Sequence, residues 1–265
     1  MKHERHFAGE SMEETFKKEM LSVRVYQTKK ELGEAAANLG ERLINEAITM
    51  RGEAAIILAT GASQFEFLQC FIKKPIDWSR VTAFHLDEYI GIPPQHPASF
   101  RKYLCDRVFS QVKMKEHYLI QGDRDNPQNE ADRISKIFDQ YRIDVAFVGI
   151  GENGHIAFND PPASFDDTVS YKVVQLDEVC RQQQFKEGWF ETIDAVPQFA
   201  ITMTIPAIMR SRAIICTVPA LRKATAVRDT LSLPVSPIIP ASILRTHEHA
   251  TLLLDQPAAS LWKNR

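Results

Sequence analysis

The sequence has few cysteines, little net charge and no long apolar run. Its four cysteines form no CxxC pair, so we expect no zinc or disulfide framework and a reducing, cytoplasmic location. No run of 18 apolar residues occurs, and residues 1–20 lack the apolar core of a signal peptide, so no membrane contact is expected. The near balance of 32 basic and 34 acidic residues argues against a surface devoted to nucleic acid.

The rest of the composition is typical of a globular protein that buries a sizeable core. Hydrophobic residues make up 44% of the chain and charged residues 25%. No repeat, low-complexity tract or linker separates two cores, so residues 1–265 are expected to form one domain. Within it, residues 1–20 are interpreted as an N-terminal extension. The stretch 161–196 has the weakest pattern and is interpreted as a lid over a site.

Short apolar runs alternate with amphipathic helical patterns along the chain. This alternation predicts βαβ units, and therefore a single α/β domain with a mostly parallel central sheet flanked by helices, in a Rossmann-like three-layer arrangement. The predicted strands are 21–26, 54–59, 81–85, 144–149, 199–204, 213–218 and 250–254. The predicted helices are 29–50, 64–72, 99–109 with Ser99 as N-cap, 129–141 and 220–230.

The segment Thr60-Gly61-Ala62-Ser63 leaves a predicted buried strand and opens a helix. Small residues let the backbone approach a ligand, and the first N–H groups of a helix attract anions. The two hydroxyls add donors, so the segment is interpreted as a phosphate cradle, with an ordinary strand–helix turn as the alternative. It is neither a Walker loop nor GxGxxG, so no nucleotide cofactor is expected.

Two basic side chains are candidates for the other side of such an anion site. Lys223 stands at a predicted helix start, where a cation is favourable only if an anion lies between it and the amide groups. A solvated surface side chain is the alternative interpretation. Arg181, in the predicted lid, is a second candidate.

Asp87 and Glu88 follow a predicted strand in an apolar setting. Partial desolvation there would raise the pKa of a carboxyl group and make it a better base. A surface acid pair that caps a loop is one alternative. A metal site formed with His85 is another, but strand alternation sends neighbouring side chains to opposite faces.

A glycine-rich segment, residues 149–160, follows the next buried strand and contains His155. An imidazole held in such a loop can carry a proton near neutral pH, although many histidines are only structural. Together these segments predict an enzyme for a small phosphorylated substrate, with a carboxylate base and a histidine and without a metal or redox cofactor.

Two long motifs, AFHLDEYIGIPPQHPASF and VGIGENGHIAFNDP, resemble the signatures of the glucosamine-6-phosphate deaminase (isomerase) family. Weaker similarity extends over residues 23–254. The resemblance implies a single α/β domain related to the 6-phosphogluconolactonases. It also implies that the enzyme opens the ring of a phosphorylated amino sugar, moves a proton between carbons 2 and 1, and releases ammonia to give fructose 6-phosphate. The family's branches include hexamers, dimers and monomers, so a homo-oligomer is compatible with it.

The resemblance also implies roles for individual residues. The catalytic residues are expected to be Asp87 as the base, His155 and Asp160 in ring opening, and Asn153. The residues expected to bind the substrate or its phosphate are the phosphate loop Thr60, Gly61, Ala62 and Ser63, its cationic partners Arg181 and Lys223, the motif's second acid Glu88, and Gly154.

The chain departs from the family pattern at several of these positions. Asp160 stands where the family usually has Glu and is one methylene shorter, Asn153 replaces an Asp, and the phosphate loop lacks a second Gly and a Thr-Pro. The segment 166–172 offers only Lys172 where allosteric members carry several basic residues. We therefore expect a divergent member without that allosteric site. A lactonase-type sugar-phosphate hydrolase and a non-catalytic sugar-phosphate sensor are the alternatives.

Overall fold

The protein is described by a computed structural model that covers residues 12–186 and 188–262. Its central sheet has eight strands in the order β1-β2-β11-β10-β7-β3-β4-β6. Neighbouring strands pair in parallel, except that β1 runs antiparallel to β2. The strands are β1 Met12–Lys18, β2 Leu21–Tyr26, β3 Ala54–Leu58, β4 Val81–His85, β6 Glu116–Tyr118, β7 Val145–Val148, β10 Ala213–Val218 and β11 Ala250–Asp255. The predicted α/β fold with a mostly parallel sheet is confirmed.

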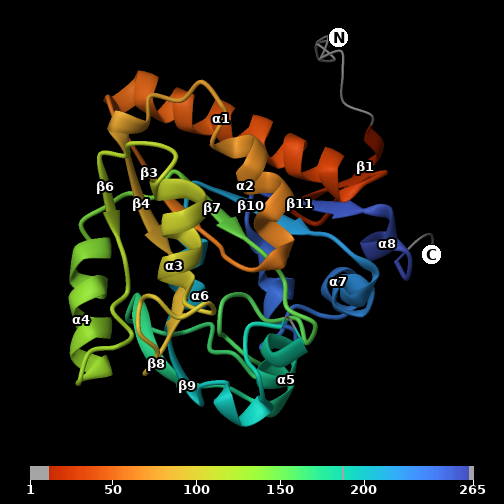
Figure 1. The fold of residues 1–265 in the computed structure, drawn as a ribbon. Helices are drawn as coiled ribbons and strands as arrows, with labels where there is room; N and C mark the ends of the chain where they lie inside the picture. Colours follow the sequence, from red (N-terminus) through yellow and green to blue (C-terminus); the bar gives the residue numbers. More distant parts are fainter. Residues whose placement is uncertain (1–11, 187, 263–265) are drawn as a thin grey trace.

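Helices cover both faces of this sheet, as Figure 1 shows. Because side chains alternate along a strand, Ile56 packs with the helices of one face and Ile57 with those of the other. The first face carries α1 Lys29–Arg51, α2 Phe65–Phe71 and α3 Phe100–Leu104. The second carries α4 Pro127–Phe138, α6 Ile205–Met209, α7 Ala224–Ser232 and α8 Gln256–Ala259.

Local sequence signals explain where several helices begin and end. Helix α1 starts with a capping box of Thr28 and Glu31 and ends at Gly52, whose φ of 84° favours glycine. Ser99 caps α3, as predicted, by accepting a hydrogen bond from the backbone N–H of Lys102. The predicted helix 99–109 continues beyond α3 as a π-helical turn over Cys105–Phe109.

The predicted strand 199–204 is present, but it does not belong to the central sheet. This segment forms β9 Phe199–Met203, the middle strand of a separate antiparallel sheet between β5 Asp87–Tyr89 and β8 Tyr171–Gln175. Its apolar pattern fits burial in either sheet, so the pattern did not distinguish them. Since β5 follows β4 after one residue, the small sheet lies beyond the carboxyl end of β4 (Figure 1).

Two further interpretations change in the structure. Within the predicted lid, β8 is a paired strand with Tyr171 buried, so it is fixed in the small sheet. Only α5 Glu178–Lys186 and the loop after it remain candidates for a lid. The predicted N-terminal extension contains the edge strand β1 over residues 12–18, and its residues 1–11 lie outside the described part.

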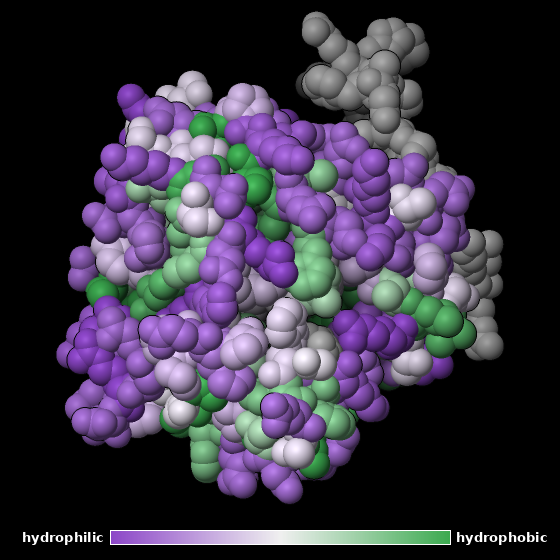
Figure 2. Space-filling model, in the orientation of Figure 1, coloured by the Kyte–Doolittle hydropathy of each residue, from purple (hydrophilic) through white to green (hydrophobic). Residues whose placement is uncertain are grey.

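The face of the molecule shown in Figure 2 is mainly hydrophilic, with hydrophobic residues gathered in small separate groups. None of the helices in the described ranges has the length and apolar character needed to span a bilayer.

Candidate active site

A cavity of about 80 Å³ lies where four parallel strands of the central sheet end. Loops that leave β3, β4, β7 and β10 all contribute to its wall. This is the edge of a parallel sheet at which ligands usually bind. The lining residues are Ala59, Thr60, Gly61, Ala62, Ser63, Leu86, Asp87, Phe100, Gly149, Ile150, Gly151, His155, Ala157, Phe158, Gln183, Gln184, Arg222 and Lys223.

The predicted phosphate cradle forms one wall of this cavity. Gly61 has a φ of 92°, which a residue without a side chain adopts readily, and its carbonyl accepts a hydrogen bond of 2.9 Å from Tyr103. Gln64 is fully buried: its amide donates to Ser63 Oγ at 3.0 Å, while its oxygen accepts from Thr217 at 3.0 Å. Since Ser63 Oγ accepts from Gln64, its hydroxyl proton can point to an acceptor in the cavity.

Lys223 reaches the same cavity from the turn after β10. This turn depends on Ala220, which has a φ of 83° and whose N–H lies 3.0 and 2.9 Å from the two carboxylate oxygens of Asp255. Lys223 itself is 4% exposed. Its neighbour Arg222 also lines the cavity and contacts Glu152 at 3.4 Å. The cavity wall therefore combines two cations with the hydroxyls and amides of the cradle.

Asp87 and Glu88 face different surroundings because successive side chains along β5 point to opposite faces of the strand. Asp87 lines the cavity, and burial together with the neighbouring charge of Glu88 raises its pKa well above the ordinary value. Glu88 is fully buried and does not line the cavity. Its carboxylate accepts from Ser99 Oγ at 2.7 Å and from the Arg101 backbone N–H and Nε at 2.9 and 3.2 Å. The structure therefore assigns Glu88 to holding the start of α3 and not to the predicted substrate contact.

His155, Asp160 and Asn153 form a connected group beside the cavity. His155 Nδ1 lies 3.0 Å from Asp160 Oδ1, and the Asn153 amide donates to the same oxygen at 3.1 Å. Asn153 Oδ1 also accepts from the His155 backbone N–H at 3.1 Å. Burial acts to raise the pKa of Asp160, but its contacts with His155 and Asn153 outweigh burial and hold that pKa below its usual range. Asp160 is thus suited to stay ionised and to orient the imidazole.

Gly151 allows the His155 ring to take this position. A Cβ at residue 151 would lie 2.3 Å from ring atoms of His155, which is far inside van der Waals contact. Gly154, which was expected to contact substrate, does not line the cavity. Its φ of 86° and its carbonyl, which accepts from the Ala241 N–H at 2.9 Å, indicate a role in the turn that carries His155.

Arg181 does not reach the cavity, contrary to its predicted role at the phosphate. Its Nη2 donates to the carbonyls of Ile193 and Val196 at 2.9 and 3.2 Å, so it fixes the loop after α5. Gln183 and Gln184 of the same helix line the cavity instead. The sequence reasoning missed both glutamines because a neutral side chain in a weakly patterned segment gives no signal for an anion site.

The glutamines are held in place by neighbours of the catalytic candidates. Gln183 accepts from the backbone N–H of Glu152 at 2.9 Å, and Gln184 accepts from the Tyr89 hydroxyl at 2.7 Å. Helix α5 is therefore connected both to the loop of His155 and to the strand of Asp87.

His85 has a structural role. Its Nε2 accepts from the Ile120 N–H at 2.8 Å, and burial, assisted by the charge of Arg101, lowers its pKa to about 3. His85 Nε2 is engaged by Ile120 and the Glu88 carboxylate by the start of α3. Among the described residues, these two and Asp87 are not a group close enough to hold a metal ion, so the metal site considered as an alternative is not formed.

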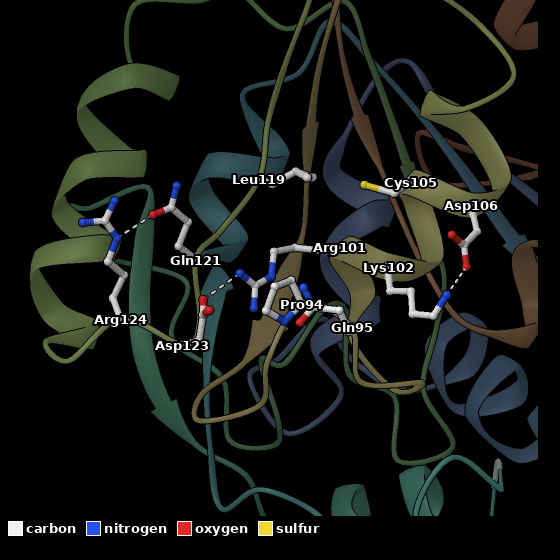
Figure 3. Close-up of a pocket in the computed structure, with 10 residues that line it drawn as sticks. All are labelled: Pro94, Gln95, Arg101, Lys102, Cys105, Asp106, Leu119, Gln121, Asp123 and Arg124. Atoms are coloured by element: carbon white, nitrogen blue, oxygen red, sulfur yellow. Dashed lines mark hydrogen bonds and ion pairs between the residues drawn. The ribbon is translucent and has the colours of Figure 1, made fainter.

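A larger cavity, of about 620 Å³, lies beside α3 and is shown in Figure 3. Two ion pairs lie in its wall, Arg101 with Asp123 at 2.7 Å and Lys102 with Asp106 at 2.5 Å. Neither Asp87 nor His155 lines it. Asp87, His155 and the cradle meet in the smaller cavity, so that cavity is the candidate active site.

The chain is similar to proteins of a known family. Residues 27–253 match the family of glucosamine-6-phosphate isomerases/6-phosphogluconolactonase. The chain belongs to this family. A glucosamine-6-phosphate deaminase of an Exiguobacterium species is 37% identical over 225 residues, which cover 85% of this chain and 87% of that protein. The deaminase of Lactobacillus delbrueckii subsp. bulgaricus is 34% identical, with 92% and 100% covered.

Solved structures of the family show the same fold. A protein described as a monomeric glucosamine-6-phosphate deaminase superposes with a TM-score of 0.84 at 34% identity, over 90% of this chain and 99% of that one. A 6-phosphogluconolactonase from Shewanella baltica has a TM-score of 0.71 at 18% identity, over 88% of this chain and 97% of that one. At that identity the second likeness concerns the fold alone.

Proposed function

We propose that this family member is a glucosamine-6-phosphate deaminase, which converts glucosamine 6-phosphate and water to fructose 6-phosphate and ammonia. The observation that carries the proposal is the meeting of Asp87, His155 and the Ser63–Lys223 cradle in one cavity. The relatives named as deaminases, 34 to 37% identical over most of the chain, support it. The proposed substrate is therefore a phosphorylated amino sugar, and the chemistry uses side chains alone.

Binding begins with the phosphate in the cradle. The Ser63 hydroxyl and the backbone amides of the loop donate to its oxygens, and Lys223 supplies a charge-assisted contact in a buried setting. Arg222, and not Arg181, is the second cation in reach of the cavity. This anchoring fixes the sugar so that its carbons 1 and 2 lie between the carboxylate and the imidazole.

His155 opens the ring. The closed sugar carries a hydroxyl on carbon 1, and opening moves that proton to the ring oxygen as the bond between carbon 1 and the ring oxygen breaks. An imidazole can both accept and donate this proton near neutral pH. Asp160, 3.0 Å from His155 Nδ1, orients the imidazole and stabilises the transient imidazolium.

Asp87 then moves the proton from carbon 2 to carbon 1. Its carboxylate removes the hydrogen on carbon 2 as the double bond shifts to carbons 1 and 2, and the ammonium group on carbon 2 gives a proton to the oxygen on carbon 1. The same carboxyl group then returns its proton to carbon 1. The nitrogen on carbon 2 is then an imine, to which water adds before ammonia leaves. The raised pKa of Asp87 makes it a stronger base than an ordinary aspartate.

We further propose that the enzyme works in the cytoplasm and needs no nucleic acid or membrane partner. Light scattering of the purified protein measures its molar mass and so tests directly whether copies of the chain associate. The similar solved deaminase is described as monomeric.

One assay separates the candidate functions. The purified protein is incubated with glucosamine 6-phosphate, and ammonia and fructose 6-phosphate are measured together. We expect both products in equal amounts, and no comparable hydrolysis of 6-phosphogluconolactone. Lactone hydrolysis without ammonia would identify a lactonase, and binding of glucosamine 6-phosphate without turnover would identify a sensor.

A further inference from the structure

Three side chains of the kinds that bind transition metals meet beside the candidate active site. They are His155 and Asp160, from the loop after β7, and Cys180 of α5, and one ligand atom from each lies within 4.8 Å of the others. Cys180 is 1% exposed and His155 7%. Among residues 12–186 and 188–262, no other group of three such side chains lies this close together.

The distances suit a four-coordinate cation. Ligand atoms around a tetrahedral zinc ion are about 3.5 Å apart, given metal–ligand distances of about 2.0 to 2.3 Å. His155 Nδ1 already lies 3.0 Å from Asp160 Oδ1. Nδ1 is buried, and the Asp160 carboxylate is the group that faces it. All three ligand atoms lie within 4.8 Å of one another, so a small inward movement would bring them to this spacing.

The ligand chemistry selects the kind of cation. A thiolate, an imidazole and a carboxylate together favour zinc and similar thiophilic divalent ions over magnesium or calcium, which prefer oxygen. His155 lines the cavity, whereas Asp160 and Cys180 do not.

We propose that His155, Asp160 and Cys180 form a binding site for a thiophilic divalent cation of the zinc type, and that the bound cation inhibits the enzyme. Binding replaces the thiol proton of Cys180, which leaves to solvent, and uses the imidazole nitrogen that faces Asp160. His155 and Asp160 are then no longer free to move a proton at the sugar ring. The inhibition rests on the proposed function, whereas the binding does not.

Cys180 is the part of this site that the proposed reaction does not use. Its sulfur does not line the cavity, and no step of the deamination requires a thiol. The chain's other cysteines offer a matched control: Cys105 is partly buried and lines the larger cavity of Figure 3, away from His155.

Binding is tested first without reference to activity. The full-length protein, freed of metal with a chelator, is titrated with cobalt(II), which replaces zinc and absorbs in the near ultraviolet when a thiolate is bound. The parent and the Cys105→Ser variant should develop this band at one cobalt per chain. Cys180→Ser should not. A parent without the band, or a Cys180→Ser variant that keeps it, overturns the site.

Inhibition is then measured with zinc. Ammonia release by the parent and by Cys105→Ser should fall as zinc is added and return when a chelator is added. Loss of one ligand should raise the zinc concentration for half inhibition at least about 100-fold in Cys180→Ser, more than loss of an outer-shell partner costs. Equal zinc sensitivity of both variants would contradict the proposal, as would full activity with the cobalt band present. If the parent releases no ammonia at all, the proposed function fails while the cobalt band still decides the site.

Discussion

Asp87 and Glu88 are adjacent in the chain, but only Glu88 has a cationic partner. Its carboxylate contacts Arg101 at 3.2 Å, whereas Asp87 is directed to the cavity with the negative charge of Glu88 nearby. The like charge and burial act in the same direction on Asp87 and raise its pKa. Glu88 thus adds to the raised pKa of Asp87 without lining the cavity itself.

A pH profile of Glu88→Gln tests this relationship. Asp87 works as a base only when ionised, so activity falls as the pH drops through its pKa. Removing the neighbouring charge should lower the pKa of Asp87, and the acid limb of kcat/KM should move to lower pH. Because the glutamine loses charge-assisted bonds at α3, the free energy of unfolding should also fall by about 1–3 kcal/mol. An acid limb at the parent's position would show that Glu88 does not act on Asp87.

The sequence predicted the central sheet well because its buried strands carry continuous apolar runs such as Ala54–Leu58. It did not assign β9 to the small sheet, because an apolar run does not reveal its partners. The same limit explains why Glu88 and Arg181 were predicted to lie at the sugar-phosphate site. Both have the charge that a sugar-phosphate site would use, but only the three-dimensional structure shows that one is bound to α3 and the other to the carbonyls after α5.

Lys223→Ala, with Arg181→Ala as its control, tests the phosphate site. A charge-assisted contact to phosphate is worth about 1.5–3 kcal/mol, so losing Lys223 should raise KM for the phosphorylated sugar by roughly 10- to 150-fold. Arg181→Ala removes the same charge outside the cavity and should leave KM near that of the parent. Steady-state kinetics check this, with circular dichroism to confirm folding. Equal effects of the two variants would mean that the cradle is misassigned.

Gly151→Ala tests the position of His155. The added methyl group would lie 2.3 Å from the ring and displace it. A displacement of about 1 Å at a catalytic group costs on the order of 100-fold in rate, so kcat should fall by about this factor. Gly91→Ala is the control without a clash: its added Cβ would meet nothing within 4 Å, so the variant shows the effect of a strained backbone alone, at a φ of 88°, and should keep the parent's kcat. If the Gly151→Ala enzyme keeps the parent's kcat, the position of His155 does not matter for catalysis and its role is structural.

Removal of metal tests whether the reaction depends on side chains alone. Each proton transfer proposed above is carried by Asp87 or His155, so ammonia release should be unchanged after dialysis against a chelator. Activity that is lost on dialysis and restored by a divalent cation would contradict this expectation.

The central claim is that Asp87 moves the proton from carbon 2, and the fate of that hydrogen tests it most directly. Glucosamine 6-phosphate is incubated in heavy water, and exchange at carbon 2 is followed by nuclear magnetic resonance. Asp87→Asn keeps the shape of the side chain and removes the base, so the turnover number should fall at least about 100-fold with little change in substrate affinity. We predict that exchange at carbon 2 stops in this variant and continues in the parent enzyme. Exchange at a rate near that of the parent would show that another group is the base.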